Sequence, residues 1–318
     1  MRLVVLVLLL FISETVHSFL HSCELNRSIL RQRSKLFLSN EDDTSSEKYT
    51  TLPRLYVGPP PTGNHVSLPV LTQDSRLDLD SDQAHYVTKV MRIDGKKKSR
   101  LRLFDGQSGE WLAQIQVTGT RNRVDVHATC LQQLQPQTVE NGPWVIFAPL
   151  KKARVKQLLE KCTELGAGRF VAVQTERTDP GSLRDLIGSV DKLALQIVEA
   201  SEQCERLTLP TLTSHNDKGE SLVSLKDMLA SWEEQTDRHL LICRERSATS
   251  VPVLEKLKDL GKVAFLIGPE GGWSADEEDL FQEWMQTSTM IHSVSLGSNV
   301  LRAETAAMTA VIAFGLAT

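Results

Sequence analysis

Two glycine-containing turns, each directly after a short apolar run, constrain this chain more than any other feature. The first turn follows residues 263–267 and reads Gly268-Pro269-Glu270-Gly271-Gly272, and the second follows residues 291–296. Helix-forming sequence comes after both turns. A strand that breaks into a glycine turn and then a helix is how α/β proteins bring backbone close to a ligand. We therefore predict that the two turns form two walls of one binding site.

The first turn has a defined shape that differs from the known nucleotide loops. Pro269 restricts the backbone, and the glycines at 271 and 272 permit positive φ angles or close approach. No Lys-Ser or Lys-Thr pair follows, and the glycine spacing is not that of the dinucleotide-binding fingerprint. A phosphate-binding role is therefore not expected. Taken alone, the first turn also fits an ordinary tight connection between a strand and a helix.

The rest of the chain predicts two domains of different class, as its 318 residues allow. Residues 54–134 alternate short apolar runs with turn signals, which indicates a small β domain. Residues 136–143, with two prolines and a glycine, form a boundary. Beyond it we predict strands at 144–149, 170–174, 239–243 and 263–267 and helices at 154–165, 183–206 and 253–260. Such alternation is typical of an α/β domain whose parallel sheet is covered by helices on both faces.

The two turns, read as IGPEGGWSADE and VSLGSNVLRAETAA, together resemble the signature of the RsmE-type family in the SPOUT superfamily of RNA methyltransferases. Members of this family methylate N3 of a uridine in small-subunit ribosomal RNA. The stretches LKKARVKQLLEKCTELG, VQTERTD and EASEQCER extend the resemblance, which runs from about Arg54 to Thr318. It implies a SPOUT domain at 143–318 with a deep trefoil knot, preceded by a PUA-like RNA-binding β-barrel at 51–135. It also implies a homodimer.

The resemblance implies S-adenosylmethionine as the cofactor, and no metal ion is expected. The residues expected to hold the cofactor come from both turns: Leu266, Ile267, Gly268, Pro269, Glu270, Gly271, Gly272, Leu296, Gly297 and Leu301. Methyl transfer to uridine N3 requires positioning, removal of the N3 proton and stabilisation of the resulting anion. We predict Arg302 as the stabilising cation and Glu270 or Glu304 as the proton acceptor. The alternative is that Arg302 pairs with one of these carboxylates and only braces the loops.

Basic residues predict where RNA binds. Residues 50–135 hold 11 Lys and Arg against 8 Asp and Glu, whereas residues 136–318 hold 19 against 26. A basic run at 89–102 and cations at the start of helix 154–165, where the helix dipole disfavours them, suit phosphate groups. Solvated lysines are the alternative for both. The predicted RNA contacts, with those that the resemblance adds, are Arg92, Lys96, Lys97, Lys98, Lys152, Arg154, Arg177, Glu199, Gln203 and Arg206, the last three near the target base.

The first 50 residues have the composition of a targeting sequence. Met1-Arg2 and ten apolar residues lead to Ser18, which predicts a signal peptide, and residues 19–39 are basic and contain several serines. Residues 40–50, acidic and rich in Ser and Thr, indicate a disordered joint. The pair of signals resembles the bipartite presequence of complex plastids; secretion and a mitochondrial presequence are the alternatives. No membrane segment is expected in the mature form, and the five scattered cysteines indicate neither disulfides nor a zinc site.

The sequence thus predicts an enzyme that methylates uridine N3 in small-subunit ribosomal RNA of an organelle, within the assembled subunit. Two alternatives stand beside this function. One is a SPOUT enzyme with another target, such as a ribose 2′-hydroxyl or a transfer RNA base. The other is a catalytically silent RNA-binding or ribosome-assembly factor, against which the presence of both turns argues.

Overall fold

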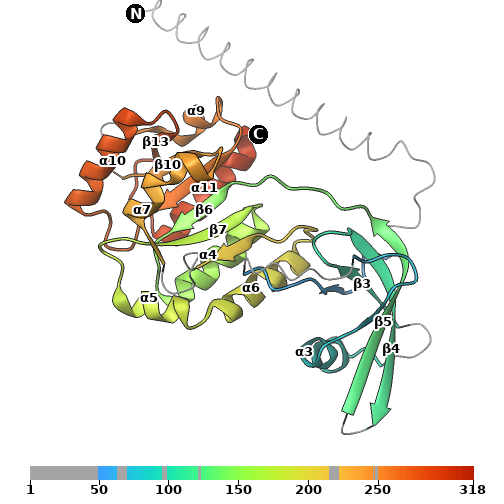
Figure 1. Ribbon diagram of the computed structural model, residues 1–318. Helices are drawn as coiled ribbons and strands as arrows, with labels where there is room; N and C mark the ends of the chain where they lie inside the picture. The colour runs from blue at the N-terminus through green and yellow to red at the C-terminus, as the bar shows by residue number, and fades with distance from the viewer. Residues whose placement is uncertain are drawn as a thin grey trace, which may run out of the picture. The chain divides into compact units, whose positions relative to one another are not determined.

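The computed structural model describes residues 49–62, 70–94, 99–120, 123–214, 222–245, 247 and 250–318 (Figure 1). The contact pattern divides the chain between Thr51 and Leu52, and Leu52–Thr318 is one compact unit that contains two sheets. The predicted targeting sequence, up to residue 48, lies outside the described residues, as does the lysine run at 96–98. Among the helices of the described residues, none combines the length and the apolar character that crossing a bilayer requires.

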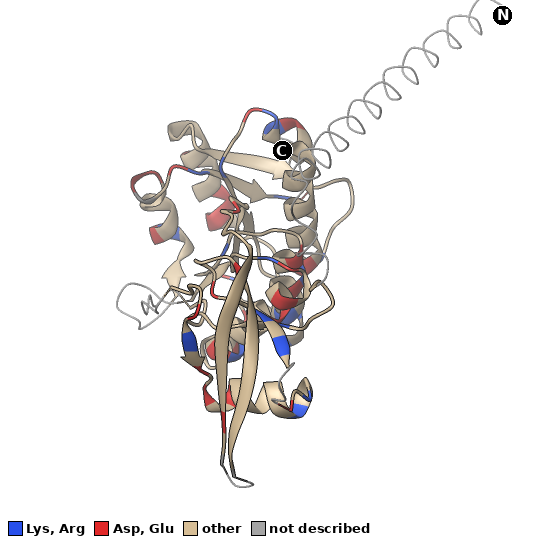
Figure 2. Ribbon diagram, turned by 90° about the vertical axis from the view of Figure 1, so that its right-hand side faces the viewer, with Lys and Arg blue, Asp and Glu red and all other residues tan. Residues whose placement is uncertain are grey.

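The smaller sheet is formed by the N-terminal part of the unit, in the strand order β1-β3-β4-β5-β2. Its elements are β1 (Arg54–Tyr56), β2 (Arg76–Asp78), α3 (Ser81–His85), the π-helix η1 (Tyr86–Val90), β3 (Arg100–Phe104), β4 (Glu110–Thr120) and β5 (Arg123–Gln135). β1 pairs in parallel with β3, and the other pairs are antiparallel. Figure 2 shows few charged segments along the long β4–β5 hairpin.

Alternation along β3 divides its side chains between two environments. Leu101 and Leu103 are fully buried in the core of the small sheet. Arg102 points to the other side, with Nη1 at 3.4 Å from Glu110 Oε2 and Nη2 at 2.7 Å from Glu205 Oε1. A period of two is what a strand imposes on its side chains. The charged side of β3 is therefore directed at the segment that follows α6 (Val190–Gln203), while the apolar side forms the core.

A buried arginine ties the small sheet to α6 of the larger one. Arg54, only 5% exposed, contacts Glu110 Oε1 through Nε at 2.5 Å. Its Nη1 donates to Ser201 O at 2.8 Å, and its Nη2 donates to Arg206 O at 2.9 Å. Carbonyl groups at the end of a helix have no partner inside the helix, and a cation there is favourable. Arg54 therefore satisfies the end of α6 and joins the two sheets through hydrogen bonds.

The larger sheet is parallel and has the strand order β11-β13-β10-β12-β6-β7-β8, with β9 paired to β7 (Figure 1). Its strands are β6 (Trp144–Phe147), β7 (Arg169–Gln174), β8 (Thr211–Thr213), β9 (Val223–Ser224), β10 (His239–Cys243), β11 (Val251–Pro252), β12 (Val263–Ile267) and β13 (Ile291–Ser295). Its helices are α4 (Lys152–Glu164), α5 (Pro180–Ile187), α6 (Val190–Gln203), α7 (Leu225–Ala230), α8 (Trp232–Gln235), α9 (Val253–Leu257), α10 (Ala275–Thr287) and α11 (Ala303–Ala317). This architecture confirms the predicted α/β class.

Both faces of the sheet are buried, which explains why β12 is apolar throughout. Phe265 and Ile267 pack in one core with residues of α4, α6, α9 and α11. Ala264 and Leu266 pack in the opposite core, which contains residues of α7, α8 and α10. Parallel strands covered on both faces read as continuous apolar runs because neither face meets water.

The structure differs from the predicted elements chiefly at residues 183–206, which form two helices. Asp179 caps the first of them by accepting a hydrogen bond from the Ser182 amide, and Pro180 occupies its first turn. That helix, α5, ends at Ile187 with Gly188 as its C-cap, and α6 then begins at Val190. Proline is favourable in the first turn and glycine at the end of a helix. These local signals override the apolar periodicity that made the segment read as one helix.

Candidate functional site

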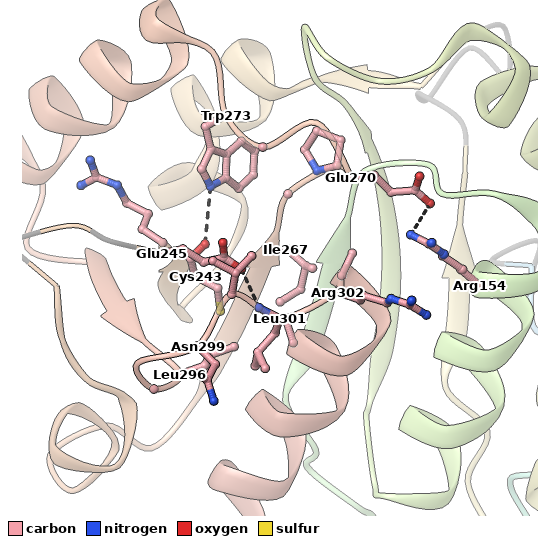
Figure 3. A pocket seen from close by; sticks show the side chains of 18 of the residues that line it. Arg154, Cys243, Glu245, Ile267, Glu270, Trp273, Leu296, Asn299, Leu301 and Arg302 are labelled. Carbon is pink, nitrogen blue, oxygen red and sulfur yellow. Dashed lines mark hydrogen bonds and ion pairs between the residues drawn. The ribbon is translucent and has the colours of Figure 1, made fainter.

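Three loops meet at one edge of the parallel sheet because β13, β10 and β12 are neighbours there. Ile242 is in register with Leu266, and Cys243 is in register with Val294, so the three strands end at the same level. The segments that follow these strands enclose a cavity of about 480 Å³. Figure 3 shows the labelled side chains of this cavity, which come from all three loops, from the ends of β10 and β12, and from α4. The structure therefore brings the two glycine turns together, as the sequence predicts.

The predicted cofactor residues divide into those that line the cavity and those that do not. Lining residues are Ile267, Gly268, Pro269, Glu270, Gly272, Leu296, Gly297 and Leu301. Leu266 is not among them, because alternation along β12 directs its side chain into the opposite core. Gly271 is not among them either, because its Cβ position lies beside the Arg177 side chain, at 3.4 Å from Cβ. Leu266 and Gly271 therefore present no side chain to the cavity, and their expected contact with the cofactor, which would be made by backbone groups, stays a prediction.

The first turn needs glycine at two of its positions. Gly272 has a φ of +69°, which side chains rarely adopt, and its amide donates to Pro269 O at 2.9 Å. At Gly268 a Cβ would lie 3.0 Å from the Trp273 ring, which stacks edge-on against Phe281. The turn is therefore closed by its own hydrogen bond and backed by a packed indole.

The third wall of the cavity is a feature that the sequence analysis missed. Cys243, Arg244 and Glu245, at the end of β10, line the cavity. Glu245 Oε1 accepts a hydrogen bond from the Leu301 amide at 2.9 Å, so this loop holds the second turn in place. Arg244 forms an ion pair with Glu278 of α10. The sequence contained a signal for this wall, namely the end of the predicted strand 239–243. Parallel strands bring their carboxyl ends to one edge of the sheet, so the segment after this strand is expected beside the two turns.

Arg154 neutralises both carboxylates that were proposed as proton acceptors. Its Nη1 lies 2.8 Å from Glu270 Oε1, and its Nε lies 3.9 Å from Glu304 Oε1. Glu304 is only 4% exposed, and its Oε2 has no hydrogen-bond partner among the described residues. A buried carboxylate is costly without a nearby cation. Arg154 therefore braces the cavity from α4, which does not support the prediction that it faces RNA.

Arg302 is in the opposite situation. It precedes α11, lines the cavity and is exposed, and its guanidinium forms no hydrogen bond or ion pair with the residues that the structure describes. The expected alternative, in which Arg302 pairs with Glu270 or Glu304, is therefore not what the structure contains, because Arg154 occupies that role. A guanidinium without a protein partner at the cavity keeps all its donors available to a ligand.

A loop after β7 supports the first turn from outside the cavity. Arg177 Nη1 donates to Gly271 O at 3.0 Å, and the Glu176 amide donates to Glu277 Oε1 at 2.9 Å. Glu277 is buried and completes the capping box of α10 with Ser274. Arg177 is thus a support for the turn, with the rest of its exposed side chain facing solvent.

The remaining predicted RNA contacts are not gathered at this cavity. Lys152 and Arg92 are exposed, at the start of α4 and after the π-helix. Arg206 is 6% exposed and donates through Nη1 to Thr163 O and Ala167 O, each at 2.8 Å. These contacts hold Arg206 at the C-terminal end of α4, whereas Arg154 lies in the first turn of that helix. Thr163 and Arg154 are separated by about 14 Å along the helix axis. The burial of Arg206 does not support a place at the target base.

Glu199 and Gln203 share that distant location. Both are exposed on α6, whose C-terminal end packs near the C-terminal end of α4. Glu199 lines a second cavity, separate from the one at the sheet edge. Within one chain, the structure therefore does not bring Glu199, Gln203 and Arg206 together with Arg302.

The chemistry of the cavity is electrostatic. Burial raises the pKa of the Cys243 thiol to about 12, so this group stays protonated at neutral pH and is a poor nucleophile. Within the described residues, no group of His, Cys, Asp and Glu is arranged to hold a metal ion. The cavity therefore offers backbone at two turns, three carboxylates (Glu245, Glu270 and Glu278) and three guanidiniums (Arg154, Arg244 and Arg302).

Comparison with known proteins identifies relatives over nearly all of the described chain. Residues 141–315 match a family model described as an RNA methyltransferase domain, and residues 79–128 match an RNA methyltransferase PUA domain. Ribosomal RNA small subunit methyltransferase E of Rickettsia conorii is 30% identical over 244 residues, which cover 76% of this chain and 90% of that protein. The protein of the same name from Synechocystis is 27% identical over 236 residues, which cover 73% of this chain and 70% of that protein.

Solved structures share the fold. Ribosomal RNA small subunit methyltransferase E from Neisseria gonorrhoeae, bound to S-adenosyl methionine, has a TM-score of 0.60 and 22% identity and covers 82% of this chain and 96% of its own. A putative methyltransferase from Legionella pneumophila, in complex with the same cofactor, has a TM-score of 0.64 and 24% identity. The match covers 83% of this chain and 97% of that one. At these identities the likeness establishes the fold.

The position of Arg154 predicts a stability effect. Arg154→Met should lower the free energy of unfolding by about 1–3 kcal/mol, because Glu304 is left buried without a cation beside it. Urea denaturation followed by circular dichroism measures the change. The matched control is Lys156→Met, an exposed cation of the same helix, which should stay within about 0.5 kcal/mol of the parent. Equal stability of the two variants would show that Arg154 does not brace the cavity.

Proposed function

Because the chain belongs to the ribosomal RNA small subunit methyltransferase E family, we propose that it transfers a methyl group from S-adenosylmethionine to N3 of a uridine in small-subunit ribosomal RNA. The observation that carries this function is the cavity formed by the two glycine turns, with Arg302 exposed beside it and its guanidinium without a partner in the described part of the chain. The match of residues 79–128 to an RNA methyltransferase PUA domain supports an RNA substrate.

The residues at the sheet edge fit the cofactor. A cavity of about 480 Å³ lies in the range of small-molecule sites. Gly268 and Gly272 let the backbone of the first turn approach a ligand where a side chain would meet Trp273 or strain the chain. Glu245, together with Glu270 and Glu278 in their pairs with Arg154 and Arg244, would face the two positive charges of S-adenosylmethionine, and Arg302 would complement its carboxylate. Ile267, Leu296 and Leu301 would enclose its apolar parts.

The chain's own residues would then position the uridine and control its proton. S-adenosylmethionine, when bound, supplies an electrophilic methyl group. Arg302 would donate hydrogen bonds to a uracil carbonyl and so stabilise the negative charge that develops when N3 loses its proton. Holding the two partners at reacting distance is the larger part of the task in such a displacement.

Glu270 is better placed than Glu304 to accept the proton. Glu270 lines the cavity with its side chain 31% exposed, whereas Glu304 is buried and does not line it. A general base must come within hydrogen-bond reach of the proton that it removes. Arg154 would hold Glu270 in position for this step through the contact at 2.8 Å.

RNA phosphates would meet cations on both parts of the compact unit. Lys152 lies at the start of α4, where the helix dipole favours an anion. Arg92 and the lysines at 96–98 belong to the basic run of the small β domain, and positive charge of this kind favours phosphate contact.

We further propose a homodimer and an organellar location. Exposed apolar side chains on α9 and α11, namely Leu254, Ile312 and Leu316, support a protein partner, as does the family resemblance, which also implies a trefoil knot. Light scattering should give twice the mass of one chain.

The composition of residues 1–50 supports a plastid as the organelle, with a mitochondrion as the alternative.

Mapping of ribosomal RNA tests the reaction and the compartment together. Primer extension on plastid and mitochondrial small-subunit RNA should stop at one uridine in the parent and read through it in a strain lacking the gene. The stop is expected because N3 lies on the Watson–Crick edge, where a methyl group blocks base pairing. A lost ribose 2′-O-methyl group, or unchanged RNA in both organelles, would contradict the proposal.

The first turn predicts how cofactor affinity depends on glycine. Gly272→Val should weaken S-adenosylmethionine binding more than about tenfold, because a β-branched residue is strained at a φ of +69° and the turn must rearrange. Isothermal titration measures the affinity, and circular dichroism checks the fold. The control is Gly261→Val, an exposed position where a Cβ meets nothing within 4 Å. A folded Gly272→Val variant with parental affinity would remove this turn from the cofactor site.

The free guanidinium predicts a kinetic effect. Arg302→Lys should lower the single-turnover methylation rate by about 10² while the affinities for RNA and cofactor stay near those of the parent. The reason is that a lysine cannot reproduce the planar set of donors. A bracing role would instead lower the melting temperature or the cofactor affinity, with a normal rate at saturation. That second pattern would exclude Arg302 from the chemistry.

A further inference from the structure

A second cavity lies where the small sheet meets α6, apart from the site at the sheet edge. Its volume is about 450 Å³, close to that of the first. It is lined by β1 and the segment after it, by α3 with its cap and the start of the π-helix, and by α6. The two cavities share no lining residue. We call the second one the acidic groove, defined by Asp80, Asp82, Asp191, Glu199 and Glu202 together with its apolar lining.

The charge of the acidic groove is of one sign. Five carboxylates line it, and none of the described lining residues is Lys, Arg or His. None of the five forms an ion pair with a residue that the structure describes. Carboxylates grouped without cations repel one another and attract a positive ligand. RNA phosphates would be repelled from this surface, so the groove cannot serve the nucleic acid in the way that Lys152 or Arg92 can.

The hydrogen bonds of these carboxylates leave most of their acceptor capacity free. Asp80 caps α3 by accepting from the amides of Asp82 and Gln83 through Oδ1. Glu202 Oε1 accepts from the Tyr56 amide at 2.8 Å. Burial raises the pKa of Glu202 to about 7, with the Tyr56 amide and Arg54 acting in the opposite direction. A cation bound beside Glu202 would relieve this cost of burial, because opposite charge favours the ionised carboxylate.

The rest of the lining is apolar and aromatic. Tyr56 and Tyr86 contribute rings, and Leu195 and Val198 contribute aliphatic side chains from α6. Leu195 is 61% exposed although it is a large apolar residue in the middle of a helix. Aromatic rings beside carboxylates recognise arginine and lysine by combining cation–π contact with charge, and the aliphatic stems of these side chains cover apolar surface.

We propose that the acidic groove docks a basic segment of a protein partner, with an arginine or lysine among the carboxylates and tyrosines and an apolar neighbour on Leu195. Charge complementarity selects this occupant, because proteins that accompany RNA carry the cations that neutralise its phosphates. The apolar lining favours a peptide over a small polycation. A peptide can place an apolar side chain on Leu195, whereas a small polycation has none to place there. The site does not depend on methyl transfer, so its test is independent of the proposed function.

The test is binding of a short fluorescein-labelled peptide of alternating arginine and leucine, followed by fluorescence anisotropy with the full chain. The variant Asp82→Asn/Asp191→Asn/Glu199→Gln should weaken binding by about tenfold or more, because three exposed attractions are lost. Leu195→Ser should weaken it by about threefold or more, because apolar contact is lost at a position already exposed. Neither change should alter S-adenosylmethionine affinity.

The matched control is Glu255→Gln/Asp259→Asn/Glu283→Gln, which removes the same charge at exposed positions outside the groove. It should bind the peptide like the parent. Equal weakening of both triple variants would show unspecific attraction to an acidic protein and overturn the proposal. So would absence of peptide binding, or binding that spermidine displaces and that Leu195→Ser leaves unchanged.

Discussion

The candidate site depends on the parallel register of β10, β12 and β13. Because these neighbours end at the same level, the segments after them must meet, and the cavity is the space that they enclose. Register also decides which side chains reach that space: Ile267 lines the cavity, whereas Leu266 is in the opposite core. A slip by one residue would exchange the two faces of β12 and bury the wrong residues. The apolar cores on both faces therefore hold the site together as well as the sheet.

Charge around the cavity is divided between two arginines with different surroundings. Arg154, from α4, lies beside Glu270 and the buried Glu304 and keeps these carboxylates compensated. Arg302, before α11, is left without a partner among the described residues and is exposed at the cavity. Arg302 is close to Glu304 along the chain, but the structure places Arg154 and not Arg302 beside that carboxylate. The free guanidinium is thus a consequence of packing between α4 and α11.

Buried cations and outward-facing carboxylates lie close together at the junction of the two sheets. Arg54 and Arg102 are buried there in contact with Glu110, and Arg54 also satisfies the carbonyl groups at the end of α6. The carboxylates of the acidic groove lie along the same helix and along α3. The junction therefore uses its cations internally and presents its anions outward. RNA held by the exposed cations of the unit would have to avoid this groove, and a basic protein segment would not.

The sequence by itself determined the α/β class, the strands 239–243 and 263–267, the two turns and their common site, because these follow from local periodicity and from glycine and proline at fixed positions. It did not determine the third wall at Cys243–Glu245, the break between α5 and α6, the burial of Arg206 or the choice of Arg154 over Arg302 as partner of Glu270. The ion pair of Arg154 with Glu270 joins residues more than one hundred positions apart, and the sequence offers several cations of equal charge as partners for Glu270. Only the packing of α4 against α11 and the sheet brings one of them within reach, since ion pairing depends on distances of a few ångströms that no local pattern contains.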